Sequence, residues 1–172
     1  CSSDLLIAQQ SNLNSMVYSW NDNQNVKHVK PYSAPIFSGK GAVLNGHALN
    51  GVTIPAGKNL QFNNSKNQER FFIIKNGIAT IQLNGKITNL NRGSVVGVMP
   101  GDKINIANNG KEKIELYEML YQSEKPDFER AVKAGGSFIT HWDDITFKPH
   151  DKGGVRQFFD RPTAMLNRFD IH

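Results

Sequence analysis

Short apolar segments alternate with Asn-Gly pairs between positions 33 and 122, and this pattern constrains the fold more than any other feature. The pairs are Asn45-Gly46, Asn50-Gly51, Asn76-Gly77, Asn84-Gly85 and Asn109-Gly110. Asn-Gly favours tight hairpin turns because both residues tolerate a positive φ. Between two of these pairs, Ile78–Leu83 alternates apolar and polar residues as a half-buried strand does. The pattern therefore predicts an all-β sandwich or barrel.

The composition excludes several classes of protein. A chain of 172 residues is long enough for one full domain. Its 20 Lys and Arg against 15 Asp and Glu give a net charge of +5, spread along the sequence without a basic cluster rich in aromatic residues. We therefore expect no nucleic-acid partner. No apolar run approaches the roughly 18–20 residues that a membrane-spanning helix needs, so we also expect no membrane span.

The single cysteine stands at position 1, which excludes an intramolecular disulfide. A start of Cys1-Ser2-Ser3-Asp4 is similar to a bacterial lipoprotein after signal-peptide removal, in which that cysteine carries the lipid. Two other origins stay open, an arbitrary boundary or the end of an uncleaved signal sequence containing Leu5–Ala8. We predict an exported protein, periplasmic or held at the envelope by a lipid anchor.

Residues outside the predicted barrel fall into three stretches. The polar residues before position 33 predict a flexible lead-in, in which 17–20 is a candidate docking point. After the barrel, Pro126–Ala134 has the start and stop signals of a short helix, and Ser137–Ile145 suggests a strand and a turn. A polar linker then precedes two more apolar segments, Val155–Phe159 and Met165–Ile171.

Two stretches of the sequence resemble the two motifs of the cupin superfamily. The first contains Pro55-Ala56-Gly57 and Gln68–Gly77, and the second runs from Gly93 through Gly101 to Asn108. This resemblance implies a jelly-roll barrel with one short helix after it and extra C-terminal strands. Lys125–Gly136 and especially Phe147–Met165 resemble the junction in secreted two-cupin proteins of the Bacteroidetes type. The chain is then divided into a lead-in at 1–32, a cupin barrel at 33–122, a helix and linker at 123–154, and the opening strands of an incomplete second cupin at 155–172.

Cupins of this superfamily hold a divalent metal with three imidazoles and one carboxylate. Here the carboxylate slot is Arg70, with Glu69 beside it, and the third histidine slot is Ile104. The first two histidine slots are Asn63 and Ser65, or Asn64 and Lys66 under the shorter spacing. Replacing imidazoles with amide, hydroxyl and alkyl groups removes the metal ligands, and Arg70 adds a charge that repels a dication. We therefore predict no metal and no cofactor.

Arg70 is the centre of the predicted binding site at the barrel mouth. Strand alternation places Arg70 and Phe72 on one face and Glu69 and Phe71 on the other. If Arg70 faces inward, it binds a small anion or a sugar with help from Gln61, Asn63 and Ser65. In the alternatives, Arg70 pairs with a barrel carboxylate, or Glu69 points inward instead.

Other candidate residues receive structural interpretations. Phe62, Phe71, Phe72 and Met99 are expected in the core. The run Glu112-Lys113-Ile114-Glu115, with Glu118, alternates charged and apolar residues along a strand and predicts a solvated face. His141 lies near Asp143 and Asp144, which suggests a surface turn, or else half of a metal site.

The sequence favours a non-catalytic, metal-free cupin module with a structural or small-ligand-binding role in an exported two-cupin protein. The alternative is a fragment of a metal-dependent hydrolase or isomerase whose active site lies in a second cupin. Residues 155–172 carry apolar strands without a barrel of their own. Such edges either fold back onto the first barrel or exchange across a homodimer, and we predict a homodimer.

Overall fold

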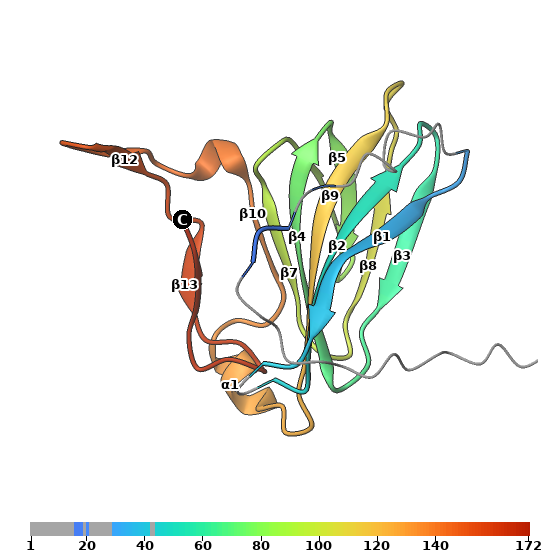
Figure 1. Ribbon diagram of the computed structural model, residues 1–172. Coiled ribbons are helices and arrows are strands. Elements are labelled where there is room, and N and C mark those ends of the chain that lie inside the picture. Colours follow the sequence, from blue (N-terminus) through green and yellow to red (C-terminus); the bar gives the residue numbers. More distant parts are fainter. Residues whose placement is uncertain (1–15, 19, 21–28, 42–43) are drawn as a thin grey trace, which may run out of the picture.

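Two antiparallel sheets form a barrel in the computed structural model, which describes residues 16–18, 20, 29–41 and 44–172 (Figure 1). The six-stranded sheet has the order β1-β2-β9-β4-β7-β10, with β1 Tyr32–Gly39, β2 Gly46–Ile54, β9 Ile114–Gln122, β4 Gln68–Asn76, β7 Val95–Val98 and β10 Phe138–Thr140. The four-stranded sheet has the order β3-β8-β5-β6, with β3 Asn59–Asn63, β8 Lys103–Ala107, β5 Ala79–Leu83 and β6 Lys86–Leu90. This mostly β architecture confirms the predicted fold class.

The Asn-Gly pairs form turns at some of the predicted places. Asn84 and Gly85 join β5 to β6 with φ angles of 49° and 79°, as a two-residue hairpin turn requires. The prediction of a joint at Asn50-Gly51 is wrong, because both residues lie inside β2 and pair with Glu118 and Tyr117 of β9. Strand β2 tolerates the pair because its neighbour β9 fixes the extended backbone over nine residue pairs.

Strand alternation divides the apolar side chains between the barrel interior and the outer face of the six-stranded sheet. Phe72 lies in the interior core and Phe71 in a second cluster on the outer face, as alternation along β4 predicted. The interior core consists of Val52, Ile54, Phe72, Ile74, Ala79, Ile81, Leu83, Leu90, Val96, Val98, Ile104, Ile106, Ile114 and Leu116. The expected core positions Phe71, Phe72 and Met99 are buried, and Phe62 is partly buried against the interior core.

The chain after β9 returns to the barrel. Helix α1 Phe128–Lys133 begins at Asp127, whose side chain accepts a hydrogen bond from the Arg130 N–H (2.9 Å), so the predicted short helix is confirmed. Strand β10 then pairs with β7 and adds residues 138–140 to the barrel sheet, and a short 3-10 helix follows at Trp142–Asp144.

The last strands form two small ribbons. Strands β11 Lys148–His150 and β12 Gly153–Val155 make a hairpin that extends away from the barrel (Figure 1). Strands β13 Phe159–Arg161 and β14 Phe169–Ile171 pair with each other, and their aromatic residues join the cluster on the outer face of the six-stranded sheet. We call residues 158–171 the C-terminal segment. Of the two arrangements considered for the C-terminal strands, the structure thus has the one folded back onto the barrel of the same chain.

The described part of the N-terminal stretch contacts the barrel through two aromatic residues, as expected for 17–20. The ring of Tyr18 lies 4.8 Å from Phe37, and Trp20 meets Tyr117 edge-on at 4.9 Å. Most of the predicted flexible lead-in, including Cys1, lies outside the described residues. Among the described residues, no helix has the length and apolar character needed to cross a bilayer.

Candidate functional site

A polar cluster lies inside the barrel, where Arg70 of β4 meets Glu118 of β9. Arg70 Nε donates a hydrogen bond to Glu118 Oε1 (2.8 Å), and only 14% and 4% of the two side chains are exposed. Asn50 Nδ2 donates to the other carboxylate oxygen of Glu118 (3.0 Å), and Asn64 Oδ1 accepts from Arg70 Nη1. We call Arg70, Glu118, Asn50 and Asn64 the interior cluster.

Neighbouring groups hold the interior cluster in place. Asn64 Nδ2 donates to the carbonyl oxygens of Val98 (2.8 Å) and Met99 (3.2 Å), so its carbonyl oxygen is turned towards Arg70. The guanidinium of Arg70 also lies 5.5 Å from the ring centre of Phe62. The buried charge of Arg70 is therefore matched by a carboxylate and an amide of the barrel itself.

The predicted companions of Arg70 lie elsewhere. Gln61 and Asn63 are exposed on β3, whose inward positions are Leu60 and Phe62, and Gln61 Nε2 donates to Asn63 Oδ1 (3.1 Å). Ser65 donates to Asn67 in the exposed turn before β4. Arg70 is thus brought together with Asn64, the slot given by the shorter motif spacing, and separated from Gln61, Asn63 and Ser65.

The prediction of a solvated face at Glu115 and Glu118 is wrong. Glu118 is buried and points into the barrel, and Glu115 is buried beneath Lys75 and Lys113 on the outer face. Hydrogen bonds and charge from these two lysines outweigh burial and lower the pKa of Glu115. Both carboxylates are buried because each has a cationic partner from β4 or from the turn before β9.

The interior cluster does not fit a divalent metal. It offers one carboxylate and two amides beside a permanent guanidinium charge, and the last histidine slot, Ile104, is a 1% exposed core residue. No group of three or more His, Cys, Asp or Glu side chains suited to a metal occurs within the described ranges. His141 instead accepts a hydrogen bond from the Asp143 N–H (3.1 Å) at the start of the 3-10 helix.

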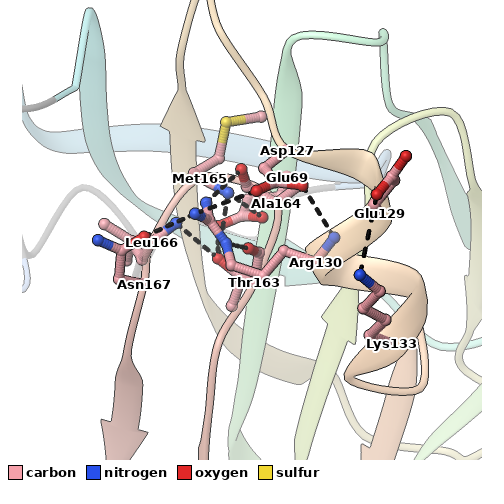
Figure 2. A network of polar contacts seen from close by, with 10 residues as sticks. All are labelled: Glu69, Asp127, Glu129, Arg130, Lys133, Thr163, Ala164, Met165, Leu166 and Asn167. Atoms are coloured by element: carbon pink, nitrogen blue, oxygen red, sulfur yellow. Dashed lines mark hydrogen bonds and ion pairs between the residues drawn. The ribbon is translucent and has the colours of Figure 1, made fainter.

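A second polar network attaches the C-terminal segment to the outer face of the barrel (Figure 2). Glu69 of β4 is 0% exposed and accepts hydrogen bonds from Thr163 Oγ1 (2.7 Å) and the Met165 N–H (3.3 Å). Burial raises the pKa of Glu69 to about 7, although these hydrogen bonds and the charge of Arg130 act in the opposite direction. Glu69 therefore keeps its proton to a higher pH than an ordinary glutamate.

Arg130 of α1 holds the same segment from the other side. Its guanidinium donates to the carbonyl oxygens of Thr163 (2.7 Å) and Ala164 (2.9 Å) and to Asn167 Oδ1 (2.6 Å). These contacts hold residues 163–167 between α1 and β4, as Figure 2 shows. These contacts join residues that are 33 or more positions apart, so local sequence patterns do not predict them.

Aromatic packing completes the attachment. The ring of Phe71 lies 4.6 Å from Phe169 in an edge-on contact and 6.0 Å from Phe159 in a stacked one. Tyr121 contacts Phe169 from β9 at 5.5 Å and stacks on His47 at 4.7 Å, and burial lowers the pKa of His47. The C-terminal segment thus covers apolar side chains of β4 and β9 that would otherwise face water.

Comparison with known proteins places this architecture among the double-stranded β-helices. No protein-family model and no curated protein matches the sequence. An uncharacterised conserved protein with a double-stranded β-helix domain from Klebsiella pneumoniae has a TM-score of 0.52 and 15% identity, over 64% of this chain and 93% of that one. The plu4264 protein from Photorhabdus luminescens has a TM-score of 0.52 and 14% identity, over 64% of this chain and 91% of that one.

A third solved structure is similar over a longer part of the chain. Protein Ylba from E. coli has a TM-score of 0.57 and 13% identity, and the match covers 84% of this chain but 54% of Ylba. This chain therefore spans about half the length of that protein. The likenesses establish the fold, an all-β barrel of the double-stranded β-helix type.

Proposed function

We propose that this chain is a non-catalytic cupin module with a structural role in an exported two-cupin protein. The observation that carries the proposal is the closed interior cluster, in which Arg70 is matched by Glu118 and Asn64. An anion that took the place of Glu118 at Arg70 Nε would leave that carboxylate buried without its cation. Such a loss costs about 3–5 kcal/mol, which opposes binding of a small anion at this place.

The match to Ylba supports the two-cupin context. It extends past the barrel and covers about half of that longer chain. In such a protein the C-terminal segment would act as the connection between the two halves, fixed to this half by Glu69, Arg130 and the aromatic cluster. Export, the lipid anchor and the homodimer stay predictions, and light scattering of the purified chain tests the last of these.

A double-mutant cycle tests the structural role of the interior cluster. We expect Arg70→Met and Glu118→Met each to lower the free energy of unfolding by about 3–5 kcal/mol, because each leaves a buried charge unpaired. The double variant should lose much less than the sum of the two. The matched control is Lys133→Met with Glu129→Gln, an exposed pair at 3.8 Å whose coupling should stay within about 0.5 kcal/mol.

Two measurements would contradict the proposal. The first is a stoichiometric metal found by elemental mass spectrometry after dialysis against Mn²⁺, Ni²⁺ or Zn²⁺, which would revive the enzyme alternative. The second is a rise in melting temperature with citrate or phosphate that Arg70→Met abolishes, because it would make Arg70 a ligand-binding residue.

A further inference from the structure

The outer face of the four-stranded sheet is lined by amide side chains. Along each of the four strands, every second side chain points away from the interior core and towards solvent. The polar residues on that side are Asn59, Gln61, Asn63, Thr80, Gln82, Asn89 and Asn105. We call this surface the amide face.

Three amides form a row across neighbouring strands. Asn105 of β8 is paired in register with Gln61 of β3 on one side and with Gln82 of β5 on the other. Ile87 of β6 is paired with Gln82 and is 65% exposed, so an aliphatic side chain ends the row. Adjacent strands lie about 4.8 Å apart, which sets the spacing of the three amide groups.

Hydrogen bonds between side chains orient several of these groups. Asn59 Nδ2 donates to Asn105 Oδ1 (2.9 Å), and Thr80 Oγ1 donates to Asn89 Oδ1 (2.8 Å). A side-chain amide has two donor hydrogens and an oxygen that accepts twice. Each bonded amide therefore keeps further donor and acceptor capacity on a surface that is already ordered.

The amide face carries little charge, although charged residues make up 20% of the chain. Among the outward side chains of these four described strands, Lys103 is the charged one. The three amides of the row and Lys103 line a hollow of about 470 Å³. The turns at Asn84-Gly85 and Gly101-Asp102 line the same hollow. That volume is within the range of about 300–1,000 Å³ typical of small-molecule sites.

We propose that the amide face binds a neutral oligosaccharide, with Gln61, Asn105 and Gln82 as its central contacts. Amides donate to one hydroxyl and accept from the next, and Ile87 offers an apolar contact for the C–H groups of a sugar ring. The two charged residues that line the hollow, Lys103 and Asp102, are of opposite sign, which matches a ligand without net charge. This site is separate from the interior cluster, so it goes beyond the structural role proposed above and does not depend on it.

The test is a titration of the full chain, labelled with ¹⁵N, with maltohexaose, cellohexaose, xylohexaose and mannohexaose. We expect at least one of them to shift amide signals of β3, β5 and β8. Gln82→Ala and Asn105→Ala should each weaken that binding about fivefold or more, the effect of losing one hydrogen bond. Gln157→Ala removes an exposed amide of the chain outside the hollow and should leave binding unchanged.

Four results would overturn the proposal. One is the absence of shifts at the amide face with all four sugars at millimolar concentration. Another is binding that neither Gln82→Ala nor Asn105→Ala weakens. The third is tighter binding of an oligogalacturonate than of every neutral sugar, which would assign the face to an acidic ligand. The fourth is a change in the amide signals of this face when the protein concentration is raised in the absence of sugar. That result would make the face a contact between two copies of this chain.

Discussion

We expect the stability of the folded chain to depend on pH through Glu69, which accepts hydrogen bonds from the C-terminal segment. Its side chain is 0% exposed, and burial raises its pKa from 4.5 to about 7. Around it are the Thr163 hydroxyl, the Met165 N–H and the guanidinium of Arg130, and Tyr121 faces it from β9. The two pKa values differ by about 2.5 pH units, which corresponds to about 3 kcal/mol of free energy.

The sign follows from where the proton is held. Between pH 4.5 and about 7 the folded chain keeps the Glu69 proton while the unfolded chain has lost it. The folded state therefore binds more protons, and its stability falls as the pH rises through this window. Below pH 4.5 the penalty is absent, and above about 7 it is complete.

Glu69→Gln isolates this contribution because glutamine does not ionise and its oxygen still accepts from Thr163 Oγ1. The free energy of unfolding is measured by urea denaturation at several values between pH 4.5 and 8.5, with tryptophan fluorescence as the signal. Relative to the parent chain, the variant should gain up to about 3 kcal/mol across that range. The gain belongs to Glu69 alone, since every other titrating group is common to both proteins.

Glu129→Gln is the matched control, because Glu129 lies on α1 with 86% of its side chain exposed. Its stability relative to the parent chain should change little with pH. Parallel pH profiles for Glu69→Gln and the parent chain would refute the reasoning. The reasoning would also be refuted if the stability of Glu69→Gln, relative to the parent chain, were higher at low pH than at high pH. That result would mean that the fold stabilises Glu69 in its charged form.

Two further substitutions test a buried amide of the barrel and the aromatic attachment of the C-terminal segment. Asn108 is 1% exposed and donates to the carbonyl oxygens of Ile54 and Glu112, both at 2.8 Å, so Asn108→Ala should lower the free energy of unfolding by about 2–4 kcal/mol. Urea denaturation measures this free energy. A loss of less than about 0.5 kcal/mol, the size of a typical surface substitution, would mean that the Asn108 amide does not stabilise the barrel. Phe169→Ala removes the ring that contacts Phe71 at 4.6 Å and should cost about 2–3 kcal/mol. It should also speed tryptic cleavage after Arg168, and unchanged cleavage would mean that the aromatic cluster does not hold the segment.

The sequence was most informative where one strand or turn determines its own geometry. The hairpin at Asn84-Gly85 and the opposite faces of Arg70 and Glu69 follow from residue type and from a period of two. Helix α1 follows from Pro126, Asp127 and the glycines after it. These features depend on residues within a few positions of each other, so no knowledge of distant contacts is needed.

The sequence misled where a distant partner decides the outcome. Glu118 alternates with its neighbours as a solvated strand does, and only Arg70, 48 positions away, makes its burial favourable. Gln61 and Asn63 were placed with Arg70 by motif spacing, yet β3 turns them outward because Leu60 and Phe62 fill the interior. Because the motif was aligned without its histidines, the position of β3 in the alignment was uncertain by one residue. A shift of one residue moves the side chains of Gln61 and Asn63 from the inner to the outer face of the strand.

The neighbouring titratable residues Glu69 and Arg70 of β4 point to opposite sides of one sheet, and they have different kinds of partner. Arg70 meets a carboxylate inside the barrel at 2.8 Å. Glu69 meets a hydroxyl and an N–H outside it, while Arg130 donates to carbonyl oxygens and to Asn167 beside it. A buried carboxylate that has hydrogen bonds but no cation in contact stays protonated to a higher pH, which avoids the free-energy cost of burying its charge. The barrel interior is thus closed by an ion pair, whereas we expect the attachment of the C-terminal segment to weaken as Glu69 loses its proton near neutral pH.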